Sequence, residues 1–342
     1  QRKLLIYTNK TLKLEIYNMK IIKKFFKHAL VIAILGYPVL HIFKTAKVLN
    51  PLKRELADFK FTDIYFGRIQ NSELDTNIYL IDIGMKDKVT TRSEITDFIN
   101  TINKKYKPKV IAIDVDFKYD ASVHDSINSK LIKSISNDNI VTSYSLDKEN
   151  LRKQRSHLHI DYNTVSEGFT NNLIKPLNKI NDSELNYGVQ RFFKPCIITS
   201  NDTLKHFSVV TAEKYSDNFD KSLLQDNNKV MINFRYEYHD PICIEDTISY
   251  HKLKDKIVII GIFTKNKSGN PLYHDDVHYT SSNKFYLGKS PPNMYGGEIM
   301  ATIISNINKD SFVKYHKSFS FWINIILSIV FYLNLLYFMG KS

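Results

Sequence analysis

Short apolar runs alternate with amphipathic stretches through the middle of the chain. Residues 78–81 and 110–113 form unbroken apolar runs, which indicate strands buried on both faces of a sheet. The stretches 92–106 and 125–136 carry apolar residues at helical spacing. With a further strand at 140–145, the order is β-α-β-α-β, which predicts a parallel sheet with right-handed crossovers.

The pattern continues with shorter elements after residue 186. The elements expected there are a β-hairpin that pairs 187–193 with 196–200, a helix at 207–215, a strand at 230–236, a helix at 246–252, a buried strand at 256–263 and a helix at 298–307. The polar stretches between them predict long loops. We therefore predict an α/β fold, a three-layer α/β/α sandwich with a mainly parallel sheet and a β-hairpin insertion.

Two longer apolar stretches, 25–43 and 319–339, flank this core. The second has 21 residues without a charge, and as a helix of about 32 Å it is long enough to cross a bilayer. The first has a shorter clean part, 29–40, which a snorkelling Lys27 extends. We predict that both are transmembrane helices. The alternatives are a cleaved signal peptide starting at Met19 for the first stretch and a buried core helix for the second.

Positive charge is concentrated at the N-terminus of this chain of net charge +13. Residues 1–27 hold eight Lys or Arg and one Glu. A basic run beside an apolar stretch favours a cytoplasmic leader, residues 1–24, over nucleic-acid binding, and no nucleic-acid-reading motif is visible. We expect residues 1–18 to lie upstream of the natural start. The same rule places residues 50–316 outside the cytoplasm, where Cys196 and Cys243 either form a disulfide or stay buried thiols.

Six short motifs lie in a fixed order between the two apolar stretches. They are Asp63-Ile-Tyr-Phe-Gly-Arg68, Ile78-Tyr-Leu-Ile-Asp82, Lys107-Pro-Lys-Val-Ile-Ala-Ile-Asp114-Val-Asp-Phe117, Tyr187-Gly-Val-Gln-Arg191, Leu253-Lys-Asp-Lys-Ile-Val-Ile-Ile-Gly261 and Tyr295-Gly-Gly-Glu298-Ile-Met-Ala301. Over about residues 55–310 the chain resembles the type 2 CHASE domain, an extracytoplasmic sensory module of bacterial receptor kinases and cyclases. It departs from that family at 86–91, which lacks a Trp-Pro-Trp segment, and at Met300, which replaces a His. The resemblance implies a sensor in the bacterial inner membrane whose domain faces the periplasm or exterior, without implying an enzymatic output.

Acidic residues follow the buried strands of the predicted sheet. Ligands bind at the carboxyl edge of such sheets, so we predict a ligand-facing set composed of Asp82, Asp114, Asp116, Arg191 and Glu298. Arg191 aligns with an Arg of the family. Clustered carboxylates repel one another unless a cation or a basic ligand joins them, which makes a cation or cationic ligand the expected signal. The alternative is that these acids cap helices or hold loops.

His274 and His278 have a spacing that suits zinc on a helix, but Pro271 favours a loop there, so we predict no metal site. No nucleophile elbow or phosphate-binding loop is visible, so we predict no catalytic residue, and the sequence names no cofactor. The leading hypothesis is a sensor that relays an unknown small-molecule or ionic signal through its membrane helices. The alternatives are an envelope scaffold with a protein partner or a second copy, and a metal-dependent envelope hydrolase.

Overall fold

The computed structural model describes residues 65–84, 90–117, 123–147, 151–154, 165–171, 189–199, 202–225, 228–265, 276–282 and 293–313, with four single positions between 322 and 329. The chain divides into two compact units, Gln1–Phe59 and Lys60–Ser342, and every described residue belongs to the second. The predicted helices at 25–43 and 319–339 lie outside the described residues, apart from those four positions. Within the described part, no helix is both long enough and apolar enough to span a membrane.

The helical elements of the described residues are short to medium in length. They are the π-helix η2 (Tyr65–Ile69), α4 (Arg92–Thr101), the π-helix η3 (Ile102–Tyr106), α5 (Asp125–Ile135), α6 (Phe207–Tyr215), the 3₁₀ helices η5 (Lys221–Leu224) and η6 (Thr247–Leu253), and α7 (Gly296–Asn308).

The strands range from two to seven residues. They are β1 (Glu73–Leu74), β2 (Ile78–Asp82), β3 (Val110–Ile113), β4 (Ile140–Leu146), β5 (Lys153–Gln154), β6 (Ser166–Phe169), β7 (Phe192–Phe193), β8 (Cys196–Ile198), β9 (Thr203–Lys205), β10 (Val230–Met231), β11 (Tyr236–Glu237), β12 (Ile242–Cys243), β13 (Ile257–Gly261), β14 (Val277–His278) and β15 (Met294–Tyr295).

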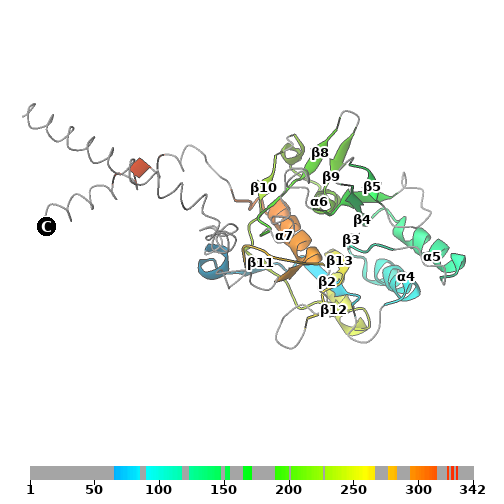
Figure 1. Ribbon diagram of the computed structural model, residues 1–342. Coiled ribbons are helices and arrows are strands. Elements are labelled where there is room, and N and C mark those ends of the chain that lie inside the picture. The colour runs from blue at the N-terminus through cyan, green and yellow to red at the C-terminus, as the bar shows by residue number, and fades with distance from the viewer. Residues whose placement is uncertain are drawn as a thin grey trace, which may run out of the picture. The chain divides into compact units, whose positions relative to one another are not determined.

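A seven-stranded sheet forms the centre of the described fold (Figure 1). Its order is β12-β2-β13-β3-β4-β5, and β6 also pairs with β4. All neighbouring strands are parallel except β5, which is antiparallel to the end of β4. The predicted parallel sheet is therefore confirmed. It also gains β13, a strand from far along the chain, in its centre.

Helices cover both faces of this sheet. Alternate residues of a strand point to opposite faces. Ile78 and Leu80 of β2 accordingly join one apolar core with α6 and α7, whereas Tyr79 and Ile81 join a second core with α4, α5 and η6. The apolar strand runs are explained by this arrangement, because each fully buried aliphatic side chain stabilises the fold by about 1.5–3 kcal/mol.

The predicted helix at 92–106 is confirmed as α4 continued by η3. It begins with a capping box, in which Thr91 Oγ1 accepts a hydrogen bond from Glu94 N at 3.3 Å and Glu94 Oε2 accepts one from Thr91 N at 2.7 Å. It ends at Lys107, whose φ of 51° lies in the left-handed region, directly before Pro108. The sequence therefore contains a signal for the start of this helix, the Thr91/Glu94 capping box, and one for its end, Pro108.

The predicted hairpin between 187–193 and 196–200 is wrong. β8 pairs instead with β9, and β7 pairs with β10. Thr199 N donates to Asp202 O at 2.9 Å, so the reversal of the chain lies after β8. The segment before Pro195, which forms β7, pairs with β10. The predicted strand at 230–236 is likewise divided into β10 and β11 by a turn.

The two cysteines lie in different parts of the fold and are not joined by a disulfide. Cys196 is buried in β8, whereas Cys243 is exposed in β12 at the edge of the central sheet. The disulfide considered for this pair is therefore absent, and the expectation that both thiols are buried is wrong for Cys243.

Candidate functional site

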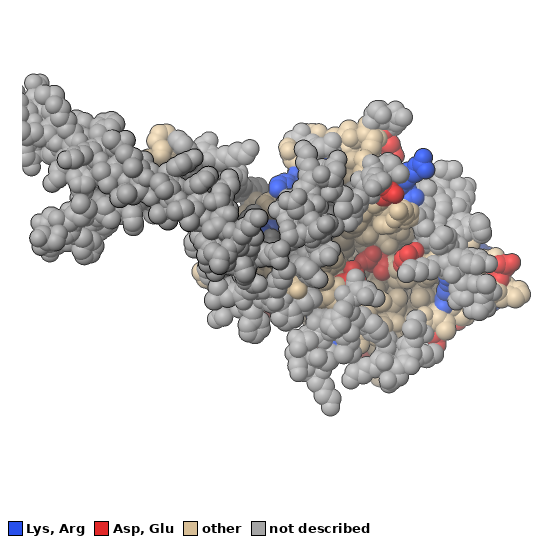
Figure 2. All heavy atoms as spheres, viewed as in Figure 1, with Lys and Arg blue, Asp and Glu red and all other residues tan. Residues whose placement is uncertain are grey.

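The carboxyl edge of the central sheet brings acidic residues of neighbouring strands together. Asp82 pairs in register with Gly261 of β13, and Asp114 N donates to Ile260 O of the same strand at 2.9 Å. Asp82 and Asp114 therefore flank β13, and two strand spacings separate their backbones by about 10 Å. Figure 2 shows acidic side chains gathered on the visible face over the region of β3 and β13.

Asp82 holds two loops at this edge. Its Oδ1 accepts hydrogen bonds from Gly84 N and Phe263 N, each at 2.9 Å, and its Oδ2 accepts one from Thr264 Oγ1 at 2.6 Å. These bonds connect the segment after β2 with the segment after β13. The carboxylate is thus engaged by the protein itself, which is the loop-holding alternative that the sequence left open.

Glu298 is engaged in a similar way at the start of α7. Its Oε2 accepts a hydrogen bond from Tyr295 N at 2.8 Å, and its Oε1 forms an ion pair with Lys265 Nζ. Tyr295 OH donates to Thr264 O at 2.5 Å. Glu298 and Asp82 are consequently connected through Tyr295 and Thr264. An acid in the first turn also favours the helix electrostatically.

Two glycines allow α7 to approach this edge closely. A Cβ on Gly297 would lie 2.7 Å from the Phe263 ring, and a Cβ on Gly296 would lie 2.7 Å from Asp276 Oδ1. Phe263 is only 1% exposed, so its ring fills the space between β13 and the helix. The Gly-Gly pair is therefore explained by packing against a ring and a carboxylate.

Asp114, Asp276 and His278 form a second group beside the N-terminus of α7. Burial, reinforced by the negative charge of Asp276, raises the pKa of Asp114 to about 7, against the opposing effects of a hydrogen bond with Ser143 and the charge of His278. His278 Nε2 lies 3.3 Å from Asp276 Oδ1, and Asp276 O accepts a hydrogen bond from Gly296 N at 3.0 Å.

This second group was only partly foreseen. The sequence placed Asp276 and His278 in a stretch considered as a zinc pair, and it did not connect them with Asp114. His278 lies in strand β14, so the helical spacing from His274 has no meaning there, and His274 itself lies outside the described residues. Among the residues described, no group of three or more His, Cys, Asp or Glu is arranged to hold a metal ion.

Asp116 and Arg191 differ in their exposure to solvent. Asp116 is exposed, two residues beyond Asp114. Arg191 is 5% exposed, and its carbonyl accepts a hydrogen bond from Ile232 N at 2.9 Å. The neighbouring Gln190 N donates to Tyr279 O at 2.7 Å, which places this segment beside the chain that follows β14. The structure thus gathers Asp82, Asp114 and Glu298 at one edge, and it places Arg191 in the interior.

The sequence that forms this arrangement matches one family model over most of its length. The model of the CHASE2 domain matches residues 32–339. The chain belongs to the CHASE2 domain family. CHASE2 is an extracytoplasmic sensory domain family, which agrees with a sensor role. No curated protein and no solved structure matches the chain.

The departure of this CHASE2 domain at Met300 lies in its core. Met300 is 4% exposed, and its carbonyl accepts a hydrogen bond from Ser208 Oγ of α6 at 3.2 Å. The Ser208 hydroxyl also lies 3.3 Å from Met300 Sδ. Met300 therefore contributes to the contact between α6 and α7 and is not one of the residues at the carboxyl edge.

Proposed function

We propose that this chain is a membrane-anchored bacterial sensor. Its CHASE2 domain binds a signal at the carboxyl edge of the sheet and relays it through transmembrane helices at 25–43 and 319–339. The observation that carries the proposal is the match of the CHASE2 family over residues 32–339. The apolar stretches at both ends of the chain support the membrane anchoring.

The group Asp114, Asp276 and His278 is the proposed centre of signal binding. Asp82 and Glu298 already accept hydrogen bonds from the protein, and Glu298 also forms an ion pair, so their role in the proposal is to hold the loops around the site. Two neighbouring carboxylates favour a ligand that carries positive charge, because such a ligand removes their mutual repulsion. The proposed signal is therefore a small cationic molecule, because the described residues offer no group of three His, Cys, Asp or Glu arranged for a metal ion. Asp116 and Arg191 stay in the predicted ligand-facing set.

Helix α7 is the proposed relay. It begins at Gly296 beside the site and ends at Asn308, and ten residues separate it from the predicted second membrane helix. Thirteen residues span about 20 Å as a rigid element. A ligand that binds more tightly to one position of the α7 N-terminus raises the population of the conformation with that position. Because the helix is rigid, its C-terminal end moves with its N-terminal end.

A stability screen of the full chain in mild detergent tests the binding step. The compounds are divalent cations and small cationic metabolites, each measured with and without a chelator. We expect at least one compound to raise the melting temperature of the wild type by several degrees, because it binds only the folded state. Asp114→Asn removes this shift, whereas Asp97→Asn, at an exposed acid of α4, retains it.

Two outcomes contradict the proposed site. A compound that stabilises wild type and Asp114→Asn equally binds elsewhere. A screen without any shift, on protein that melts cooperatively, overturns the small-ligand sensor and leaves the scaffold with a protein partner as the function to pursue.

A further inference from the structure

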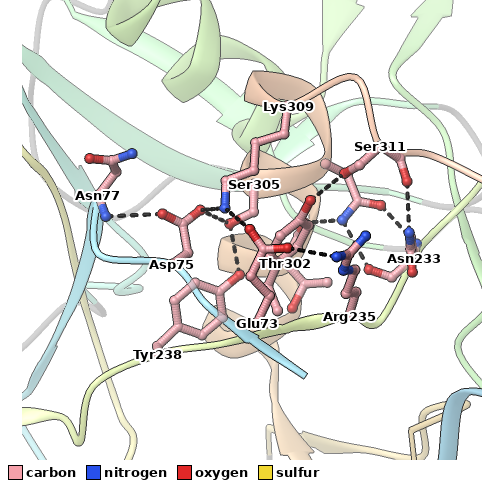
Figure 3. A network of polar contacts seen from close by, with 12 residues as sticks. Glu73, Asp75, Asn77, Asn233, Arg235, Tyr238, Thr302, Ser305, Lys309 and Ser311 are labelled. Atoms are coloured by element: carbon pink, nitrogen blue, oxygen red, sulfur yellow. Dashed lines mark hydrogen bonds and ion pairs between the residues drawn. The ribbon is translucent and has the colours of Figure 1, made fainter. Parts of the chain in front are cut away.

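The edge of the sheet opposite the candidate site holds a connected polar network (Figure 3). Its members come from β1 and the residue that follows it, from the segment that includes β11, and from the C-terminal half of α7 with the residue that follows it. We call it the latch and define it by Glu73, Asp75, Asn233, Arg235, Tyr238, Ser305, Asn306 and Lys309. No residue of the latch was singled out from the sequence, because its members come from segments far apart in the chain.

Asp75 is the centre of the first half of the latch. It is 3% exposed, and its Oδ2 accepts a hydrogen bond from Ser305 Oγ at 2.7 Å, with Lys309 Nζ at 3.5 Å. Its Oδ1 accepts a hydrogen bond from Asn77 N at 3.0 Å. The Ser305 hydroxyl also lies 2.9 Å from Tyr238 OH. Burial raises the pKa of Tyr238, so this phenol stays protonated.

Ion pairs extend this half toward the surface. Lys309 Nζ lies 3.3 Å from Glu73 Oε1, and Arg235 lies 3.0 Å from Glu73 Oε2. The amide of Glu73 also donates to Arg235 O at 2.9 Å. Glu73 is thereby bound both to the end of α7 and to the segment beside β11.

Asn233 is the centre of the second half. Its backbone N donates to Asn306 Oδ1 at 2.7 Å, and Asn306 Nδ2 donates back to Asn233 O at 3.0 Å. The Asn233 side chain accepts a hydrogen bond from Gln70 Nε2 at 2.9 Å and donates to Ser311 O at 2.8 Å. Asn233 thus contacts both the segment before β1, through Gln70, and the segment after α7, through Ser311.

The network therefore joins two connections of the domain. Residues 65–75 form the N-terminal connection, which follows the predicted first membrane helix. Residues 309–313 form the C-terminal connection, which precedes the predicted second one. Both pair with the same segment, because Asp75 N donates to Glu237 O at 2.9 Å and Val313 N donates to Met231 O at 3.3 Å.

We propose that the latch couples the two connections, so that they open and close as one cooperative unit at the end of α7. Its use as the output of a signal rests on the proposed sensor function, but the coupling itself is a property of the folded chain. When Ser305 moves, the buried carboxylate of Asp75 loses its hydroxyl partner. A state in which only one connection is released is therefore unfavourable, because it leaves a buried acceptor without a hydrogen bond. The coupling therefore depends on Ser305 and Asp75 being bound at the same time.

Amide hydrogen exchange on the full chain in mild detergent tests the coupling without any ligand. The probes are the amides of Glu73 and Asp75 in the N-terminal connection and those of Ser311 and Val313 in the C-terminal connection. For Ser305→Ala we expect exchange to accelerate about tenfold or more at both connections together. The matched control is Ser134→Ala, which removes a buried hydroxyl that donates to Asn100 Oδ1 at 3.0 Å between α5 and α4.

A milder variant covers the case in which Ser305→Ala does not fold. Lys309 has a side chain about 30% exposed, and Lys309→Met removes its ion pairs to Glu73 and Asp75. We expect acceleration of about two- to fivefold at both connections, as suits a partly exposed pair.

Acceleration at one connection alone, or equal acceleration in Ser134→Ala, overturns the latch. The exchange experiment uses no ligand, so its result is independent of the result of the ligand screen. The two proposals therefore fail separately.

Discussion

Asp114 shows what the sequence predicts about a single acid and what it does not. Its position after a buried strand predicted the carboxyl edge of the sheet, and the structure places it there. Asp82 has the same sequence signal, yet its carboxylate is bound by Phe263 and Thr264, which lie more than 180 residues further along the chain. Nothing local to Asp82 distinguishes a bound acid from an available one. That difference depends on loops that the fold brings together.

The protonation of Asp114 gives a prediction at this scale. The folded pKa of about 7 exceeds the ordinary value of 3.8, so between these limits the unfolded chain loses a proton that the folded chain keeps. The free energy of unfolding therefore falls as pH rises from about 4 to about 7. In Asp114→Asn this contribution is absent, and its stability relative to wild type should increase over that range by about 1–4 kcal/mol.

Thermal or denaturant unfolding of both proteins at pH 4, 5.5 and 7 measures this difference. His206 contributes in the opposite direction, because burial lowers its pKa to about 3, so folding is weakened as pH falls below its ordinary value of 6.5. The comparison at each pH cancels that contribution, since both proteins contain His206. A stability difference that stays constant with pH shows that Asp114 ionises normally.

At the scale of elements, long periodic segments were predictable and short strands were not. The sequence predicted α4 with η3, α6 and β2 within a residue or two, because a buried face imposes its period on the local sequence. It failed for β7 and β8. Strands of two or three residues carry too little pattern to fix their partner, which is chosen by tertiary contacts with β10 and β9.

The contact of α7 with β13 gives a prediction at this second scale. Gly297→Ala places a methyl group 2.7 Å from the buried ring of Phe263, and the helix or the ring must move. We expect a loss of about 1–3 kcal/mol in the free energy of unfolding, which is typical of overpacking. Chemical denaturation measures it.

A second substitution provides the control for this packing argument. Phe263→Leu on its own creates space and is destabilising, whereas in Gly297→Ala it relieves the clash. The double variant should therefore be more stable than the sum of the two single effects predicts. If the two destabilising effects simply add in the double variant, the methyl group of Gly297→Ala does not clash with the Phe263 ring.

At the scale of the whole molecule, the order of six motifs was sufficient for the family. The alternation of strands and helices was sufficient for a parallel sheet with helices on both faces. The latch was beyond prediction, since Asp75 and Ser305 are 230 residues apart and neither belongs to a recognisable pattern. Helix α7 connects the candidate site with the latch. Its first turn lies beside Asp276, its last turn contains Ser305, and Lys309 directly follows it.

We propose that the CHASE2 domain faces the outside of the cell membrane and binds its signal there. The exposed thiol of Cys243 allows a direct test, because the only other cysteine, Cys196, is buried. We would treat intact spheroplasts that express the full chain with a membrane-impermeant maleimide. The account predicts labelling of the wild type and of Cys196→Ser before lysis, and none of Cys243→Ser. Labelling of the wild type only after the membrane is disrupted would contradict it.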